Sequence, residues 1–226
     1  MNHRIKLYIT FSFLLLIIIS CSKDNLSLNF DTSYFPLGIG QSTQFDIERT
    51  DYSLSSSPKI TSLTTLQIIS ASFKDINDQL VFETTHFVQT NNSEWSLDYT
   101  NTAWRTLDKA MSQENGQTVI NMAFPVANDV SWNGNLFNAN GKEMFRMINV
   151  GKPYQTETTL FPNTVTIIRQ DDSTLLSRNR YIEIYAKDVG LIRKEKIFLQ
   201  YCNTPDCVGK GIINSGWTEF SSIKND

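Results

Sequence analysis

The feature that most constrains the fold is a succession of short segments rich in β-branched and aromatic residues, separated by Asn, Asp, Gly and Pro. In residues 80–85, for example, Leu80, Phe82 and Thr84 share one face, which is the period-2 alternation of a half-buried strand. The segments predicted as strands are residues 41–48, 60–73, 80–85, 94–99, 103–111, 117–124, 144–150, 158–170, 175–186, 191–201 and 211–223. Because no convincing amphipathic helix accompanies them, the sequence predicts a single antiparallel all-β domain.

Turn signals between these segments indicate that consecutive strands are joined by hairpins. Asn115-Gly116 is the clearest signal, because this dipeptide tolerates the positive φ angles that tight hairpins require. Residues 171–173 and 188–190 are predicted as further turns, and residues 50–59 and 128–141 as polar loops. Hairpin connections of this kind favour a meander curled into a barrel or half-barrel.

The N-terminal residues have the pattern of a secretion signal. Arg4 and Lys6 precede a run of 13 mostly apolar residues at positions 7–19. The run is too short to span a bilayer as a helix, which takes about 20 residues, but it matches the apolar region of a signal peptide. We therefore expect residues 1–20 to be a signal peptide.

The apolar run ends on Ile-Ile-Ser-Cys at residues 18–21, which resembles the bacterial lipobox. This resemblance implies that the Cys21 thiol takes a diacylglyceryl group and that cleavage frees its amine for a further acyl chain such as palmitate. Two or more chains anchor a protein stably to a membrane that it does not span. The alternatives are an ordinary signal peptide with an incidental cysteine, or a short amphipathic anchor. Lys23-Asp24 resembles the charged surface-export signal of Bacteroidota lipoproteins, and a solvated linker is the other interpretation.

Composition beyond the signal peptide fits one β-rich domain. Residues 1–20 hold two of the 20 basic residues and none of the 23 acidic ones, so the remainder has a net charge of −5. Dispersed charges of this sign argue against nucleic acid, which recruits clustered Lys and Arg. The charged residues 193–196 alternate between the faces of a predicted strand, so we expect a cross-strand ladder on a solvated face. The expected organisation is a lipidated cysteine and flexible tether at 21–33 and a domain at 34–226.

The remaining cysteines and histidines limit the metal chemistry available. Cys202 and Cys207 indicate a disulfide in an oxidising compartment, with a metal pair or redox site as the alternative. Redox pairs usually have two intervening residues rather than four, and no second Cys or His pair completes a zinc set. His86 is the only histidine after residue 20, which excludes sites built on two histidines. We therefore predict neither a metal nor a cofactor.

Trp132, Asn133 and Asn135 form the most distinctive surface candidate, as part of the sequence Trp-Asn-Gly-Asn. An exposed Trp flanked by amides can stack on sugars and hydrogen-bond to them. The alternative is structural: Trp132 plugs the end of a barrel while the Asn-Gly pair makes a turn. We favour the structural interpretation.

His86 and paired carboxylates are the candidates for catalysis. Glu83 and Asp75 lie near His86 in sequence, but a lone strand histidine is more often a packed or solvated side chain. Asp171-Asp172 resembles a carboxylate pair, yet Asp is common in turns for local hydrogen bonding. No nucleophile elbow, P-loop or His-Glu-x-x-His motif is present.

Three motifs of this chain resemble uncharacterised lipoproteins of the Bacteroidota outer membrane and periplasm. They are Tyr-Phe-Pro-Leu-x-x-Gly at residues 34–40, Phe-Pro-Val at 124–126 leading to Ser-Trp-Asn-Gly-Asn at 131–135, and Tyr-Ala-Lys-Asp-Val-Gly-Leu-Ile at 185–192. The resemblance implies an envelope location and β architecture, and it carries no catalytic residue.

Taken together, these features predict an outer-membrane lipoprotein that acts as a non-catalytic binding or assembly protein. The expected partners are membrane lipid through N-terminal acylation, and other envelope proteins or a glycan, with no nucleic acid. The alternative is an envelope hydrolase whose site forms around His86 or paired carboxylates.

Overall fold

The computed structural model describes residues 31–90 and 93–224. The predicted signal peptide, Cys21 and residues 22–30 of the predicted tether lie outside these ranges, so cleavage and lipidation stay predictions. Within the described part, no helix is long and apolar enough to cross a membrane.

The described chain folds into twelve antiparallel strands, which confirms the predicted all-β class. A short 3-10 helix, η2 (Thr32–Tyr34), precedes them. The strands are β1 (Ser42–Ser53), β2 (Ser56–Lys74), β3 (Leu80–Gln89), β4 (Ser96–Arg105), β5 (Lys109–Glu114), β6 (Gln117–Ala123), β7 (Ser131–Asn133), β8 (Met144–Gln155), β9 (Leu160–Ser173), β10 (Ser177–Ala186), β11 (Gly190–Tyr201) and β12 (Ile213–Lys224).

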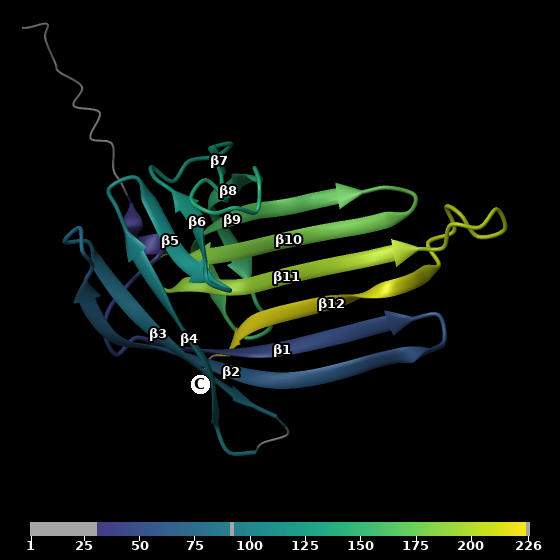
Figure 1. Ribbon diagram of the computed structural model, residues 1–226, viewed down its shortest axis with the longest axis horizontal. Coiled ribbons are helices and arrows are strands. Elements are labelled where there is room, and N and C mark those ends of the chain that lie inside the picture. The colour runs from purple at the N-terminus through teal and green to yellow at the C-terminus, as the bar shows by residue number, and fades with distance from the viewer. Residues whose placement is uncertain (1–30, 91–92, 225–226) are drawn as a thin grey trace, which may run out of the picture.

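All twelve strands belong to one sheet made of two meanders joined at its centre. The order is β6-β5-β4-β3-β2-β1-β12-β11-β10-β9-β8-β7, so the first and last strands of the chain pair with each other (Figure 1). The β1–β12 register runs from Gln44 opposite Lys224 to Ser53 opposite Ser215. Because each meander is built from hairpins, the prediction of hairpin connections is confirmed. Two of its details are wrong: residues 96–105 form one strand, β4, where a break after residue 99 was predicted, and β7 lies within the predicted loop at 128–141.

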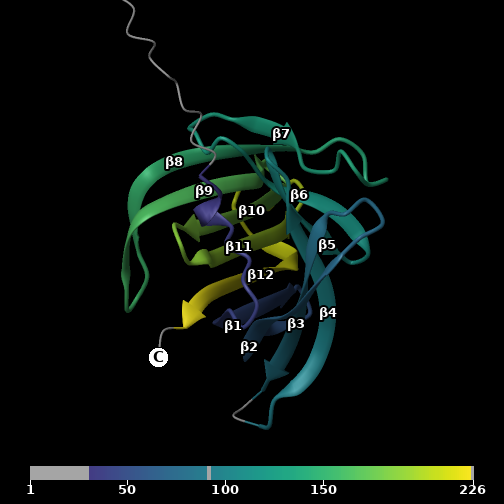
Figure 2. The same cartoon turned by 90° about the vertical axis from the view of Figure 1, so that its left-hand side faces the viewer.

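The sheet curls until its two edge strands almost meet, which gives the predicted barrel-like shape (Figure 2). Register shifts interrupt most of the strand pairings, for example between Ile69 and Ala71 of β2. Such bulges bend a strand and increase its twist, and this is how a long sheet rolls up. At the seam, Ile120 N of β6 donates to Gly134 O beside β7 at 2.9 Å.

The turn chemistry is partly as predicted. Asn115 and Gly116 have φ angles of 49° and 75° and join β5 to β6 in a two-residue hairpin, as expected. The predicted loop at residues 50–59 is wrong, because β1 continues to Ser53 and β2 already begins at Ser56. Pro58 is tolerated there because β2 pairs with β3 only from Thr64 onward, so this part of β2 is an edge.

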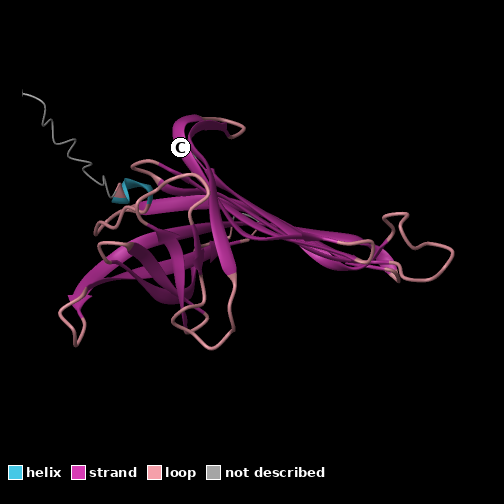
Figure 3. Cartoon of the chain, turned by 90° about the horizontal axis from the view of Figure 1, so that it is seen from above, coloured by secondary structure: helices cyan, strands magenta, loops and turns pink. Residues whose placement is uncertain are grey.

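Buried apolar residues form two clusters, and the larger one occupies one end of the curl and leaves part of the interior unfilled. Its buried residues come mainly from β5, β6, β8 and β9: Ala110, Val119, Met122, Phe145, Met147, Val165 and Ile167, with Tyr34 and Tyr185. From this end the long strands β1, β2 and β9–β12 extend as a flatter arm (Figure 3). The space between this core and the arm is lined mainly by polar side chains.

The disulfide between Cys202 and Cys207 is formed, as predicted. Their Cα atoms are 5.8 Å apart, and the bridge lies in the loop between β11 and β12. A covalent loop this short stabilises the fold by about 2 kcal/mol in the chain-entropy estimate. Its place at the far tip of the arm makes it a structural clip, remote from the unfilled interior.

Residues 31–33, which precede the predicted start of the domain, contact the sheet and its turns. Asp31 pairs with Lys187 at 2.8 Å, and Thr32 O accepts from Arg105 Nη1 at 3.0 Å. Asp188 N also donates to Ser33 O at 2.9 Å. The segment from Asp31 onward is therefore held against the end of the barrel rather than extending away from it.

Candidate functional site

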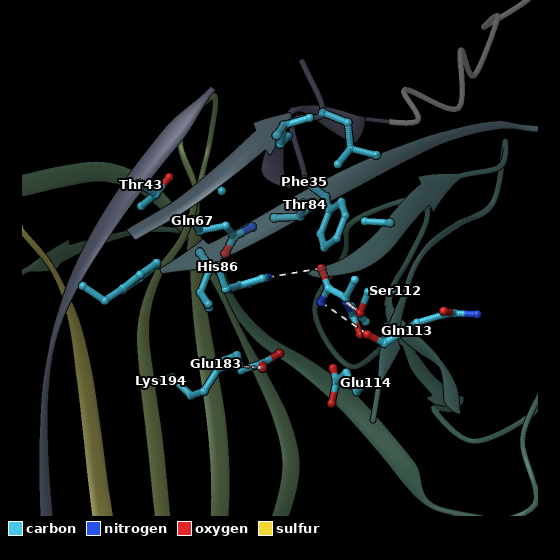
Figure 4. Close-up of a pocket in the computed structure, with 18 of the residues that line it drawn as sticks. Phe35, Thr43, Gln67, Thr84, His86, Ser112, Gln113, Glu114, Glu183 and Lys194 are labelled. Atoms are coloured by element: carbon cyan, nitrogen blue, oxygen red, sulfur yellow. Dashed lines mark hydrogen bonds and ion pairs between the residues drawn. The ribbon is translucent and has the colours of Figure 1, made fainter. Parts of the chain in front are cut away.

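A cavity of about 580 Å³ opens inside the curl, between β2–β6 on one side and β10–β11 on the other (Figure 4). This volume is in the range of small-molecule sites, roughly 300–1,000 Å³. Residues 35–37, which follow η2, line one end of it. The strand register explains the lining: Gln67 of β2 lies opposite His86 of β3, which in turn lies opposite Tyr99 of β4. Side chains at these paired positions share the concave face.

A buried ionic network forms one wall of the cavity. The Arg169 guanidinium of β9, whose side chain is only 6% exposed, binds both oxygens of Glu114 at 2.9 and 3.1 Å. Arg169 Nη1 also donates to Glu183 Oε1 of β10 at 3.3 Å. The hydroxyls of Tyr181 and Tyr185 each donate to Glu183 at 2.9 Å. Arg169 therefore joins the two halves of the curled sheet, because Glu114 sits at the β5–β6 hairpin.

The network fixes the ionisation of its members. Burial alone would raise the pKa of the Glu183 carboxyl, but Arg169, Lys194 and the two tyrosine hydroxyls outweigh it and lower the pKa to about 2. Burial, with the neighbouring carboxylate, raises the pKa of both Tyr181 and Tyr185 well above the ordinary value. Glu183 is thus a permanent anion and both tyrosines are permanent hydrogen-bond donors at neutral pH.

This arrangement is not that of a carboxylate acid–base pair. Glu114 and Glu183 approach each other only through the guanidinium that they share. A general acid needs a raised pKa, whereas that of Glu183 is lowered. The predicted Asp171-Asp172 candidate lies within β9 rather than in a turn, and Asp171 pairs with Arg180 at 3.5 Å.

His86 faces the cavity, but without the carboxylate partners considered from the sequence. Its ring stacks on Tyr99 at 4.2 Å between centroids, and Nε2 lies 3.1 Å from Asn101 Oδ1. Glu83 instead accepts from Ser70 Oγ at 3.2 Å, and Asp75 accepts from backbone amides in the β2–β3 turn. Burial lowers the pKa of His86, and the nearby Lys194 adds to this, so the imidazole is neutral at pH 7.

Two lysines complete the cavity wall. Lys194 lies opposite Glu183 and Lys196 opposite Tyr181 in the β10–β11 register, and both line the cavity. The alternation expected for residues 193–196 is therefore present, but the prediction that the ladder stands on a solvated face is wrong for these two. Burial and the neighbouring Lys194 lower the pKa of Lys196.

The described residues contain no group of three or more His, Cys, Asp or Glu side chains that could hold a metal ion. The functional groups that the cavity presents are hydroxyls, amides, one imidazole, two ammonium groups and two carboxylates held by Arg169. These groups can bind and orient a polar molecule.

Comparisons with known proteins give only distant similarity. No protein-family model matches the chain, and no curated protein matches it. One similar solved structure is a protein classed as exported, with a YmcC-like fold, from Bacteroides fragilis NCTC 9343: it is 10% identical with a TM-score of 0.44, covering 84% of this chain and 98% of that one. Another is a protein classed as a lipoprotein from Parabacteroides distasonis ATCC 8503, 11% identical with a TM-score of 0.41 over the same shares.

The Trp-Asn-Gly-Asn element lies at the seam of the barrel and not in the cavity. Trp132 is half-buried on β7, packs edge-on against Phe145 at 6.0 Å, and donates Nε1–H to Ile120 O of β6 at 2.7 Å. A Cβ at Gly134 would lie 2.3 Å from the buried Phe145 ring, so only glycine fits there.

Both amides of this element are engaged by the chain itself. Asn133 Oδ1 accepts from Asn135 N at 3.2 Å and from Glu143 N at 3.0 Å. The Asn135 side chain is buried, donating to Glu143 at 3.2 Å and accepting from Asn138 at 3.0 Å. These contacts favour a structural role over a ligand platform. Trp132 does not plug the end of the barrel, as the structural interpretation had it, but fastens β7 to β6 at the seam through Ile120 O.

Sequence reasoning missed the residues that matter most in the cavity. Tyr181, Glu183 and Tyr185 alternate with Ile182 and Ile184, so one face of β10 is polar although both faces are buried. A carboxylate in the middle of such a strand was the available signal. Its partner Arg169 lies on another strand, and no local pattern connects the two.

Proposed function

We propose that this protein is a lipid-anchored envelope protein that binds a hydroxyl-rich, sugar-like ligand in the cavity and does not transform it. The observation that carries this proposal is the polar lining of the cavity, held in place by the buried Arg169 network. Cavities for apolar ligands are lined mainly by aliphatic and aromatic side chains with few polar groups. Here polar groups line most of the wall.

Several of these groups have hydrogen-bonding capacity left for a ligand. Among the described residues, the side chains of Gln67 and Thr84 make no hydrogen bond, and both face the cavity (Figure 4). Asn121 Nδ2 donates to Ser112 Oγ at 2.8 Å, which leaves the Ser112 hydroxyl hydrogen for an acceptor. Planar amides and hydroxyls of this kind match the adjacent hydroxyls of a sugar.

Aromatic rings beside these groups suit the apolar faces of a sugar ring. Phe35 lies at one end of the cavity. Tyr99 of β4, which is half exposed, also lines it. Aromatic side chains supply rigid apolar area, and Tyr adds a polar tip. The combination supports binding. The lowered pKa of Glu183, and the hydrogen bond of His86 to the Asn101 amide rather than to a carboxylate, argue against hydrolysis.

The anchor is tested by replacing the predicted lipidation site. Cys21→Ala is expected to release the protein from membranes, because no thiol remains to accept the diacylglyceryl group. Membrane fractionation with metabolic palmitate labelling measures this. Label retained by the variant would show that the lipobox assignment is wrong.

Ligand binding is tested with oligosaccharides released from envelope polysaccharide by mild acid and mixed with full-length protein in detergent. Native mass spectrometry is expected to show a one-to-one complex. Gln67→Leu should weaken it about tenfold, since one hydrogen bond to a polar ligand contributes about 1–1.5 kcal/mol. The melting temperature should change by less than about 2 °C.

Gln200→Leu is the matched control, because Gln200 is exposed on β11 and does not line the cavity. It should bind as the wild type does. If no oligosaccharide is retained, or if both variants bind equally, the cavity is not the binding site.

A further inference from the structure

We infer that the ligand carries an anionic group, a carboxylate or a phosphate, which binds between Lys194 and Lys196. This inference rests on the proposed function and names the class of ligand more closely: an acidic rather than a neutral oligosaccharide. It rests on the long distances between these two ammonium groups and their nearest carboxylates.

Neither ammonium group has a close carboxylate partner in the described part of the chain, although Lys196 Nζ lies 5.1 Å from the centre of the Tyr181 ring. Lys194 Nζ lies 3.6 Å from Glu183 Oε1, and Lys196 Nζ lies 3.8 Å from Glu219 Oε1. Both distances exceed the 2.7–2.9 Å of a charge-assisted hydrogen bond. Within residues 31–90 and 93–224, neither Nζ makes a hydrogen bond, although both side chains are almost three-quarters shielded from solvent.

The two carboxylates near these lysines are already committed to other groups. Glu183 accepts from Arg169, Tyr181 and Tyr185, each at 3.3 Å or less. Glu219 lies 3.4 Å from Arg49, whose guanidinium also stacks on a tryptophan ring. The lysines therefore retain N–H donors that no acceptor among the described residues takes.

The charge balance of the wall also favours an anion. Glu114 is the other carboxylate lining the cavity, and Arg169 binds both of its oxygens. The groups at this wall are three cations, Arg169, Lys194 and Lys196, and two carboxylates, which leaves one positive charge in excess. Glu219, the carboxylate 3.8 Å from Lys196, does not line the cavity and also pairs with Arg49. An anion placed there pairs with ammonium groups already stripped of most of their water, which strengthens the attraction.

His86 provides an internal reporter of this site. The charged and titratable groups around its ring are Lys194 of β11, and Tyr99 and Asp98 of β4. Lys194 lowers the pKa of His86, so an anion bound at Lys194 is expected to raise it. Binding should therefore tighten as the pH falls from 7 toward 5, where a raised pKa lets the bound complex take up a proton.

The test divides the same oligosaccharides into neutral and acidic pools by anion exchange. Full-length protein in detergent is expected to retain the acidic pool at least tenfold more tightly. Reduction to alcohols removes the carboxylates of the oligosaccharides, and phosphatase treatment removes their phosphates. The treatment that abolishes the preference for the acidic pool identifies the anionic group that binds. This comparison uses the wild-type protein alone, so its result stays interpretable even if a lysine substitution impairs folding.

Lys194→Gln and Lys196→Gln should each weaken acidic-pool binding about tenfold, and their effects should shrink in high salt. Lys210→Gln, at an exposed residue in the β11–β12 loop, should have no effect. In protein with ¹⁵N-labelled histidine, the imidazole signal that disappears in His86→Gln should titrate at higher pH with the acidic pool bound.

The outcomes separate the two proposals. Equal retention of both pools, with no change on reduction or phosphatase treatment, would overturn the anionic inference and leave sugar binding in place. Retention of neither pool would contradict both the anionic inference and the proposed sugar binding. An imidazole titration unmoved by a bound acidic oligosaccharide would place the anion away from Lys194.

Discussion

Arg169→Met is expected to lower the free energy of unfolding by about 3–5 kcal/mol, since it leaves the buried Glu183 carboxylate without its main counter-charge. The side chains of Arg169 and Glu183 are 6% and 3% exposed, so water cannot replace the lost partner. For a domain of this size each kcal/mol moves the midpoint by about 2–4 °C. Thermal denaturation followed by circular dichroism should therefore show a fall on the order of 10 °C.

A second substitution tests whether the unpaired Glu183 carboxylate causes this loss of stability. The double variant Arg169→Met with Glu183→Leu should recover a substantial part of the loss, because a buried ion pair replaced by apolar residues is often neutral. Glu114→Gln is a milder control, as the Glu114 side chain is 34% exposed. A fall of less than about 1 kcal/mol for Arg169→Met would mean that Glu183 is not held as the structure shows.

The pH dependence of this loss has a definite sign. The wild-type pKa of Glu183 is lowered from 4.5 to about 2, so its contribution to stability is present above pH 4.5 and is lost as the pH falls toward 2. Without Arg169, the largest opposition to the effect of burial is gone, so we expect the pKa of Glu183 to rise and the variant to gain stability when Glu183 takes up a proton. The difference between wild type and Arg169→Met should therefore narrow as the pH falls below neutrality.

Trp132→Ala is expected to cost about 3–5 kcal/mol, as large aromatic truncations in cores do. Trp132 packs on the fully buried Phe145 and donates to Ile120 O across the seam, so its loss loosens the closure between β7 and β6. The matched control is Trp95→Ala: Trp95 is 37% exposed and lies just before β4, away from the seam, so its truncation should cost clearly less than that of Trp132.

One thermal melt of each variant distinguishes the two interpretations of Trp132. A fall on the order of 10 °C fits the seam contact. A shift under about 2 °C, together with lost retention of envelope oligosaccharides, would show instead that Trp132 is a ligand platform. The engaged amides of Asn133 and Asn135 lead us to expect the large fall.

Local sequence determined the features that depend on neighbouring residues alone. Period-2 alternation indicated the strand at residues 80–85, which is part of β3. Asn115-Gly116 indicated a hairpin because both residues tolerate positive φ angles. The separation of Cys202 and Cys207 sufficed for the disulfide, since both lie in one loop. In contrast, the Ser-rich residues 50–59 carry a turn composition that the sheet overrides, because the arm supplies a neighbouring strand for them.

Only the tertiary structure decided where the candidate site lies. Glu183 and Lys194 face each other across the β10–β11 hairpin, but His86 lies far before them in the sequence. His86 meets them because the two meanders pair through β1 and β12 and then curl. Glu183 became a buried anion only when Arg169 from β9 reached it and bound Glu114 of β5 as well. Burial and ion pairing are properties of the assembled sheet, so no single strand reveals them. Strand alternation and hairpin turns depend on neighbouring residues, so they could be predicted from the sequence.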